Sequence, residues 1–248
     1  SGRMVTDTNR YDFIRQSPEA PDTVNPSLWR HAQLNANIGL YKVMDGVYQL
    51  RGFDIANITL IEGKTGWIVV DALTSRESAA AAMAFAEQHL GKKPVTGLVM
   101  THAHADHFGG ALGVLSQQDA AQRKVPIVAP AGFMEEATSE NVLVGTAMGR
   151  RSVYQFGRDL PRSAKGNVDT GLGKDVIYGS IGIVTPTLKY RIPYLQSGVD
   201  SWPPTNASDQ LLPADNAAAE LKRAQPLILH AMRNFTRYTA ARVSTRQQ

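Results

Sequence analysis

The sequence predicts a layered α/β domain, and three observations lead to that prediction. Apolar, β-branched segments alternate with segments of helical composition along the first half of the chain. The 248 residues are 43% hydrophobic, which is enough to bury one sizeable core. Three histidines and an aspartate follow one of the apolar segments directly, at 102–107. Strands that alternate with helices favour a sheet covered by helices.

The first expected elements are strands. Residues 43–50 and 57–62 alternate or cluster β-branched side chains, and both segments are therefore predicted to be extended. The polar, glycine-containing segment 63–66 is typical of a hairpin loop, and it leads into a strand over 67–71. The predicted order is strand, turn, strand.

Helices and strands then alternate. Ser75–Leu90 is helical by composition, with four consecutive alanines, and Gly91 stands where a helix C-cap is expected. Residues 94–100 form a short apolar segment, predicted to be a buried strand. The segment 106–121 is expected to pass through a glycine turn into a second helix, and 125–129 is the next apolar strand.

The histidine motif predicts a metal site. His102 and His104 are two residues apart, so in extended backbone their side chains leave the same face and can bind one ion. Asp106 and His107 follow where the strand gives way to a turn, and they can point to a second ion. Imidazole and carboxylate ligands suit Zn²⁺, with Mn²⁺ or Fe as substitutes. The alternative is an exposed histidine-rich loop that binds metal only adventitiously.

The motif H-x-H-x-D-H at the end of a strand resembles that of the metallo-β-lactamase superfamily. Further segments resemble one branch of it, the linear alkylsulfatases of bacteria. The segments that carry this resemblance are residues 23–30, 48–59, 129–137, 139–143 and 166–174. The resemblance covers about residues 22–187, roughly two thirds of the chain.

The resemblance implies a metallo-β-lactamase-like αβ/βα sandwich that is incomplete in its second half. Residues 1–21 are then an N-terminal extension, 22–187 the body of the domain, and 188–248 a divergent C-terminal segment. That last segment is basic, with eight Lys or Arg and four Asp or Glu. The resembled family has further metal ligands there, but Asn216 stands where a ligand carboxylate is expected and His230 is only a weak match.

The implied function is metal-dependent hydrolysis of alkyl sulfate esters, such as dodecyl sulfate, to an alcohol and inorganic sulfate. Two zinc ions are expected if the site is complete, and Asp106 is expected to orient the attacking water and accept its proton. Two alternatives stay open. One is another hydrolase of the superfamily, acting on a lactone, thioester, β-lactam or phosphodiester. The other is a non-catalytic, truncated relative.

Five other residues need an interpretation, and three of them have two. Asp71 ends a predicted strand, so it either orients a metal-binding histidine or caps the helix from Ser75. His31 and His89 lack partners in sequence and are expected on the surface. Arg158 and Arg162 either border a pocket for the sulfate group or are solvated loop charges.

Other functional classes find little support. Residues 168–175 are not a phosphate-binding loop, because Val168 replaces the first glycine and Asp175 the Ser or Thr. The chain has no G-x-S-x-G motif, no nucleic-acid reader motif and no apolar run of membrane-spanning length. Ser1–Arg10 is polar, so no signal peptide is expected in this chain, although the resemblance implies a periplasmic or secreted enzyme. The expected partner is an alkyl sulfate, with neither nucleic acid nor membrane insertion, and a homodimer is an open expectation.

Overall fold

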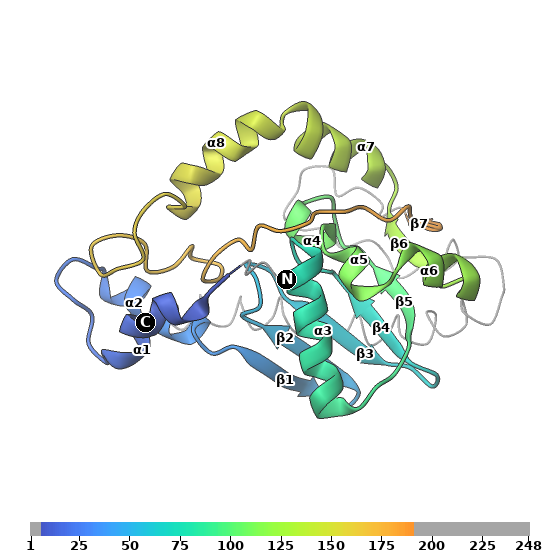
Figure 1. Cartoon of the computed structure of the whole chain (residues 1–248), viewed down its shortest axis with the longest axis horizontal. Coiled ribbons are helices and arrows are strands. Elements are labelled where there is room, and N and C mark those ends of the chain that lie inside the picture. Colours follow the sequence, from blue (N-terminus) through green and yellow to red (C-terminus); the bar gives the residue numbers. More distant parts are fainter. Residues whose placement is uncertain (1–5, 191–248) are drawn as a thin grey trace, which may run out of the picture. The chain divides into compact units, whose positions relative to one another are not determined.

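The computed structural model describes residues 6–190, and in this part of the chain seven strands form one mixed sheet in chain order (Figure 1). The first four strands pair antiparallel with their neighbours, and the fourth to seventh pair parallel. The strands are β1 (Gly39–Met44), β2 (Val47–Arg51), β3 (Ile58–Glu62), β4 (Trp67–Val70), β5 (Val95–Val99), β6 (Ile127–Pro130) and β7 (Leu188–Tyr190).

Helices precede, connect and follow these strands. They are η1 (Thr8–Tyr11), α1 (Asp12–Gln16), α2 (Pro26–Asn35), α3 (Arg76–Leu90), α4 (Ala105–Phe108), α5 (Ala111–Val114), α6 (Gln117–Arg123), α7 (Phe133–Thr138), the π-helical turn η2 (Ser139–Leu143) and α8 (Gly145–Phe156). Within residues 6–190, no helix is both long and apolar enough to cross a membrane.

The first predicted strand, 43–50, is wrong as a single element. The structure has a hairpin there, in which β1 and β2 are joined by a tight turn at Asp45 and Gly46. Gly46 has a φ of 74°, a conformation that glycine adopts without steric cost. The Asp-Gly pair is a strong hairpin signal, so the sequence did contain the evidence for this turn.

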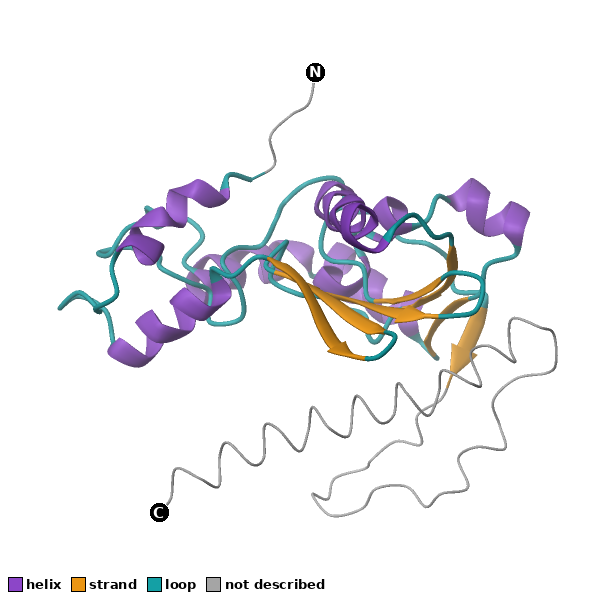
Figure 2. Ribbon diagram, turned by 90° about the horizontal axis from the view of Figure 1, so that it is seen from below, coloured by secondary structure: helices purple, strands orange, loops and turns teal. Residues whose placement is uncertain are grey.

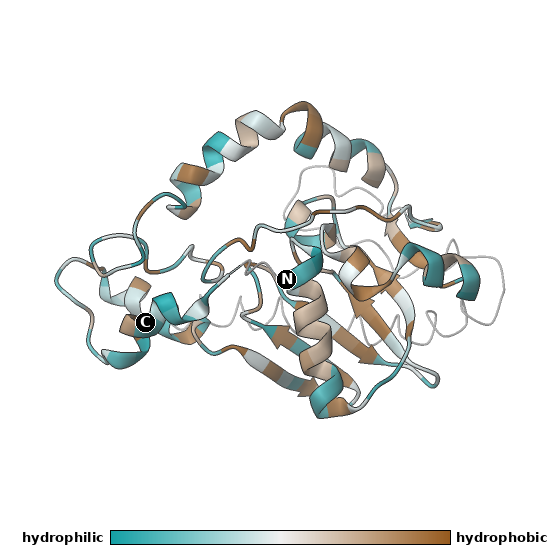
Figure 3. Ribbon diagram, in the orientation of Figure 1, coloured by the Kyte–Doolittle hydropathy of each residue, from teal (hydrophilic) through white to brown (hydrophobic). Residues whose placement is uncertain are grey.

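The core lies between the central strands and α3. Leu60, Val69 and Leu98 are fully buried on neighbouring strands, and the hydropathy colours show the same apolar centre (Figure 3). The predicted helix from Ser75 is confirmed, because the Ser75 hydroxyl caps α3 and Gly91 ends it with a φ of 77°. The buried face of α3 is built from small residues, which bring the helix close to one side of the sheet (Figure 2).

The glycine turn predicted within 106–121 is present at Gly109 and Gly110, but the single helix predicted after it is wrong, since two short helices, α5 and α6, follow the turn and α4 precedes it. The break at Gly109 and Gly110 has a packing cause. A Cβ at Gly109 would lie 2.2 Å from the carbonyl oxygen of Thr74, and one at Gly110 would lie 2.1 Å from that of Ala72. The two glycines are therefore needed for close approach between the loop after β4 and the segment after the histidine motif.

The N-terminal segment packs against a later part of the chain. Tyr11 and Ile14 form a small second core with Trp29, Ala32 and Val168. The predicted boundaries at 21/22 and 187/188 stay predictions, although the sheet includes β7 beyond 187. Asn216, His230 and residues 191–248 of the predicted basic segment lie outside the described residues.

Candidate metal centre

The histidine motif lies at the carboxyl ends of the parallel strands β4 and β5. The backbone N–H of Asp71, one residue after β4, donates to the carbonyl of Val99 at 2.8 Å, so the two strand ends stay in register. Asp71 has a φ of 61°, a left-handed conformation that is uncommon for residues other than glycine. His104 is the N-cap of α4, and Asp106 and His107 lie in that helix. The end of β5 and the start of α4 thus bring all four predicted ligands to one place.

His102 and His104 face each other. The Nε2 atom of His102 lies 2.9 Å from Nδ1 of His104, although the backbone at His102 and Ala103 bends and is not extended as predicted. The Thr101 hydroxyl lies 2.9 Å from both carboxylate oxygens of Asp71 and 3.0 Å from Nδ1 of His102. Because the hydroxyl has one proton and gives it to the carboxylate, it accepts from His102 Nδ1–H. That bond leaves Nε2 of His102 unprotonated, with a lone pair that can bind a metal.

His107 is held between two carboxylates. Its Nδ1 lies 2.8 Å from Asp71, and its Nε2 lies 3.2 Å from Asp106. Burial lowers the pKa of His107, but the hydrogen bonds to Asp106 and Asp71 outweigh burial and raise the pKa from 6.5 to about 10. Burial raises the pKa of Asp106, but His107 outweighs it and holds the pKa below 3.8.

The pKa of His102, at the other end of the motif, shifts in the opposite direction to that of His107. Burial, followed by the neighbouring rings of His107 and His104, lowers the pKa of His102 below its ordinary value. A histidine with a lowered pKa is neutral at pH 7, and the neutral ring is the form that ligates a metal.

Of the two interpretations of Asp71, the geometry favours the one that involves histidine. Its carboxylate contacts His107 and Thr101, whereas the Ser75 hydroxyl caps α3. A carboxylate on the second nitrogen of a ligating histidine fixes the ring orientation and tautomer.

The donor set fits a metal in its chemistry and spacing, with His107 releasing the proton that its carboxylate neighbours stabilise when it ligates. Two ligand atoms on one tetrahedral zinc, each about 2.0–2.1 Å from the ion, lie about 3.3 Å apart. The pair His102/His104 is separated by 2.9 Å and the pair Asp106/His107 by 3.2 Å. Within residues 6–190, however, no three His, Cys, Asp or Glu side chains are arranged to hold one ion. Each pair therefore accounts for two of the three protein ligands typical of a catalytic zinc.

A cavity of about 430 Å³ opens beside the first pair. Its polar lining comes from the motif and from α7 and η2, and its apolar lining comes from the start of α8. The lining residues are His102, Ala103, His104, Glu136, Ser139, Glu140, Val144 and Met148. Thr101 and Glu140 were not predicted as site residues. Thr101 could have been suspected from its place next to His102, but no spacing in the sequence connects Glu140 to the motif.

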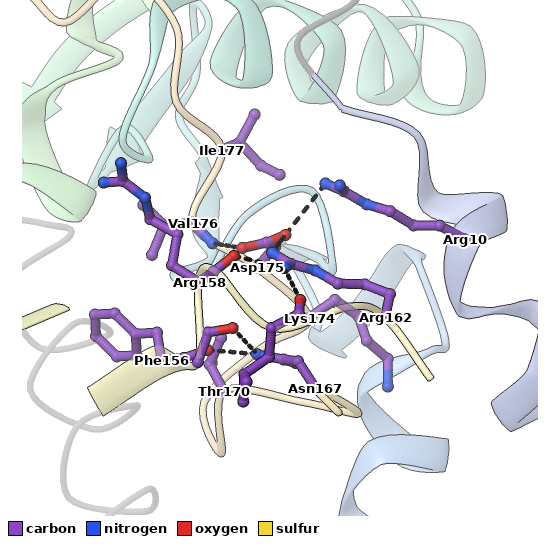
Figure 4. A network of polar contacts seen from close by, with 12 residues as sticks. Arg10, Phe156, Arg158, Arg162, Asn167, Thr170, Lys174, Asp175, Val176 and Ile177 are labelled. Carbon is purple, nitrogen blue, oxygen red and sulfur yellow. Dashed lines mark hydrogen bonds and ion pairs between the residues drawn. The ribbon is translucent and has the colours of Figure 1, made fainter. Parts of the chain in front are cut away.

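Arg162 does not face this cavity. Its guanidinium is 2.6 Å from Asp175, and it also donates to the Tyr11 hydroxyl at 3.2 Å (Figure 4). Arg158 lies 4.9 Å from the ring of Tyr178 and is exposed. The interpretation of Arg162 as either a sulfate ligand or a solvated charge is therefore wrong, because it is an internal ion-pair partner.

The two other histidines within residues 6–190 are exposed, as predicted. His31 is on α2, and His89 is in the last turn of α3, where its ring stacks on Phe85 with centroids 4.3 Å apart. Neither is near the motif in sequence, and neither contacts it in the described part of the chain.

Comparison with known proteins identifies the family of this chain. The family model described as the metallo-beta-lactamase superfamily matches residues 51–223. A linear primary-alkylsulfatase from Pseudomonas sp. is 46% identical over 186 residues, which are 75% of this chain and 28% of the relative. The alkyl/aryl-sulfatase BDS1 of Saccharomyces cerevisiae is 43% identical over 221 residues, 89% of this chain and 33% of that protein. Because this relative is from yeast, bacterial origin stays a prediction.

The fold agrees with these matches. The solved structure of a stereoselective inverting sec-alkylsulfatase from Pseudomonas sp. superimposes with a TM-score of 0.73 at 47% identity. It covers 80% of this chain, and this chain covers 31% of it. The chain thus spans about a third of the length of the relatives it matches. The predicted metallo-β-lactamase-like α/β fold is confirmed. The chain belongs to the metallo-beta-lactamase superfamily, and the relatives it resembles within that superfamily are alkylsulfatases.

Proposed function

We propose that this chain provides the metal-binding part of a hydrolase that cleaves alkyl sulfate esters, such as dodecyl sulfate, to an alcohol and inorganic sulfate. One observation carries the proposal: the donor pairs His102/His104 and Asp106/His107 meet at the strand ends of a chain that is 43–46% identical to alkylsulfatases. A member of this family implies a metal, and imidazole with carboxylate favours zinc, with manganese or iron as substitutes.

The proposed ligands are His102, His104, Asp106 and His107, with two ions if each pair is completed by further ligands. A bound zinc would stabilise developing negative charge and lower the pKa of a water molecule. The remaining chemistry belongs to the protein. Asp106 orients the water and accepts its proton, while its own contact with His107 keeps the carboxylate ionised.

The cavity beside the motif suits an amphiphile. The histidines line one part of it, and Val144 and Met148 offer an apolar surface for an alkyl chain at another. Hydrolysis adds one water to the ester, transfers a proton from it, and releases the alcohol and sulfate. A homodimer, a periplasmic or secreted location, and a domain over 22–187 belong to this proposal as well.

The test is metal content and turnover on the full 248-residue chain. Elemental analysis after purification without added zinc is paired with sulfate release from dodecyl sulfate. The His104→Ala variant should lose both zinc and sulfate release, and the matched control His89→Ala, an exposed histidine on α3, should keep both. Unchanged zinc content in His104→Ala would refute the site.

A second candidate function has one observation in its favour. No three donor side chains converge in residues 6–190, as expected for a relative that binds metal weakly and does not catalyse. One zinc or none, with no sulfate release and no hydrolysis of a lactone, thioester, β-lactam or phosphodiester panel, would support this non-catalytic alternative. Turnover of a panel member without sulfate release would support another hydrolase of the superfamily.

A further inference from the structure

We infer that Glu140 is a positioning residue that selects the metal-binding tautomer of His104. The Oε1 atom of Glu140 lies 3.5 Å from Nε2 of His104, which is within ion-pair distance. Glu140 is half-buried and lies on η2, far from the motif in sequence. This inference rests on the proposed metal site and adds to it a residue outside the H-x-H-x-D-H motif.

The local backbone of η2 is unusual. The N–H of Val144 donates to the carbonyl of Ser139 at 3.0 Å, five residues back, which defines a π-helical turn. Such turns are rare, and those that occur are often found at functional sites. In this turn the Asn141 side chain donates to the carbonyl of Ala137 at 2.9 Å and lies 3.5 Å from the carbonyl of Ala103. Two successive residues of η2 therefore contact the segment that holds His104.

The position of the proton on the His104 ring decides whether the two facing nitrogens, Nε2 of His102 and Nδ1 of His104, are both available to a metal. With the proton on Nε2, Glu140 is an acceptor 3.5 Å from that nitrogen, and Nδ1 keeps its lone pair for a metal. With the proton on Nδ1, the ring donates to Nε2 of His102, 2.9 Å away, and both donor atoms are occupied at once. A carboxylate beside Nε2 favours the first tautomer, because it attracts the N–H and repels a lone pair.

The other two histidines of the motif have equivalent partners. Thr101 accepts from Nδ1 of His102, and Asp71 accepts from Nδ1 of His107. Glu140 completes the set from a different element and on the opposite nitrogen of the ring. Glu136 also lines the cavity, but it forms no ion pair in the described part of the chain.

The test compares Glu140→Ala, Glu140→Gln and a control, Glu135→Gln, which changes an exposed carboxylate one turn earlier that does not line the cavity. Zinc affinity is measured by competition with a chromophoric chelator. Glu140→Ala should bind zinc about 10-fold more weakly, as is typical when a partner of a ligating histidine is lost. Glu140→Gln keeps an acceptor oxygen and should recover most of that loss, and Glu135→Gln should match the wild type.

A second readout needs no bound metal. Long-range ¹⁵N–¹H correlation spectra of metal-free protein report which nitrogen of His104 has the proton. The proton should shift from Nε2 toward Nδ1 in Glu140→Ala but not in Glu135→Gln. Wild-type zinc affinity and an unchanged tautomer in Glu140→Ala would overturn the inference. Loss of a whole equivalent of zinc in Glu140→Ala would also overturn it, because Glu140 would then be a ligand. A wild-type chain that binds no zinc would refute the proposed metal site instead, while the tautomer still tests the role of Glu140.

Discussion

Two clusters of charged and polar side chains in this chain differ in how their members are paired. In the loop network, made by Tyr11, Arg162, Lys174, Asp169 and Asp175, cations face anions: Arg162 pairs with Asp175 at 2.6 Å (Figure 4), and Lys174 pairs with Asp169 at 3.2 Å. In the motif cluster, made by His102, His104, Asp106 and His107, only one end is paired in this way, with His107 lying 3.2 Å from Asp106. At the other end, Nε2 of His102 faces Nδ1 of His104 at 2.9 Å.

This difference distinguishes a structural cluster from a candidate metal-binding cluster. Buried charges are stable when each has a partner, as in the loop network, which joins the N-terminal segment to the loop before β7. The facing nitrogens of His102 and His104 can share one proton in a hydrogen bond, whereas a metal ion between them would engage both lone pairs. Four substitutions test this distinction between the two clusters.

The largest effect is expected from Asp106→Asn. The amide keeps the shape of the side chain but loses its charge and its capacity to accept a proton, so sulfate release should fall by roughly 10²–10⁴-fold. Thermal unfolding of the variant should show that the fold is kept. Turnover within a few-fold of the wild type would show that Asp106 has no catalytic role.

Breaking the loop network should reduce stability and leave metal binding unchanged. In Arg162→Met, the buried carboxylate of Asp175 loses its closest cation, and within residues 6–190 Arg10, at 3.2 Å, is the cation that it keeps. The free energy of unfolding should fall by about 3 kcal/mol, measured by urea denaturation. Arg158→Met removes an exposed cation that stacks on Tyr178, and it should cost less than about 1 kcal/mol. Reduced zinc content in Arg162→Met would contradict the separation of the two clusters.

Removing the carboxylate behind His107 tests the cluster through its support. Asn tolerates the left-handed backbone of Asp71, so Asp71→Asn should fold while weakening the hold on Thr101 and His107. Zinc affinity, measured by chelator competition, should fall about 10–100-fold. Wild-type affinity together with an unchanged circular dichroism spectrum would show that Asp71 serves the fold alone.

The smallest effect concerns Tyr11 in the loop network. Burial, followed by the charge of Asp175, raises the pKa of Tyr11 from 10.0 to about 12. Because the folded-state pKa lies above the unfolded value, the stabilisation is complete below pH 10 and is lost as the pH rises toward 12.

Tyr11→Phe should therefore cost about 1 kcal/mol at pH 7, from the lost hydrogen bond to the carbonyl of Lys174. It should also make the stability less dependent on pH between 10 and 12. Urea denaturation across this range measures both effects, and equal pH dependence in the two proteins would argue against the raised pKa.

Much of the fold follows from local pattern. Alternating or apolar segments predicted β3, β4, β5 and β6, and the Ser75 and Gly91 caps bounded α3, because these features depend on neighbours in sequence. The hairpin at Asp45 and Gly46 was missed although its turn signal is local. The break at Gly109 and Gly110 could not be foreseen in its cause, since the carbonyls that require it belong to residues more than thirty positions earlier.

The sequence by itself determined the family, the α/β fold and the four candidate ligands His102, His104, Asp106 and His107. These four residues lie within six positions of the sequence, so they are close together whatever the tertiary structure of the rest of the chain. Only the tertiary structure decided the partners of those ligands. Asp71, which follows β4, contacts His107, and Glu140 of η2 contacts His104. Arg162 pairs with Asp175 and is therefore not free to bind a sulfate group. Such contacts join segments far apart in the chain, and packing of the core, rather than any local pattern, brings those segments within bonding distance.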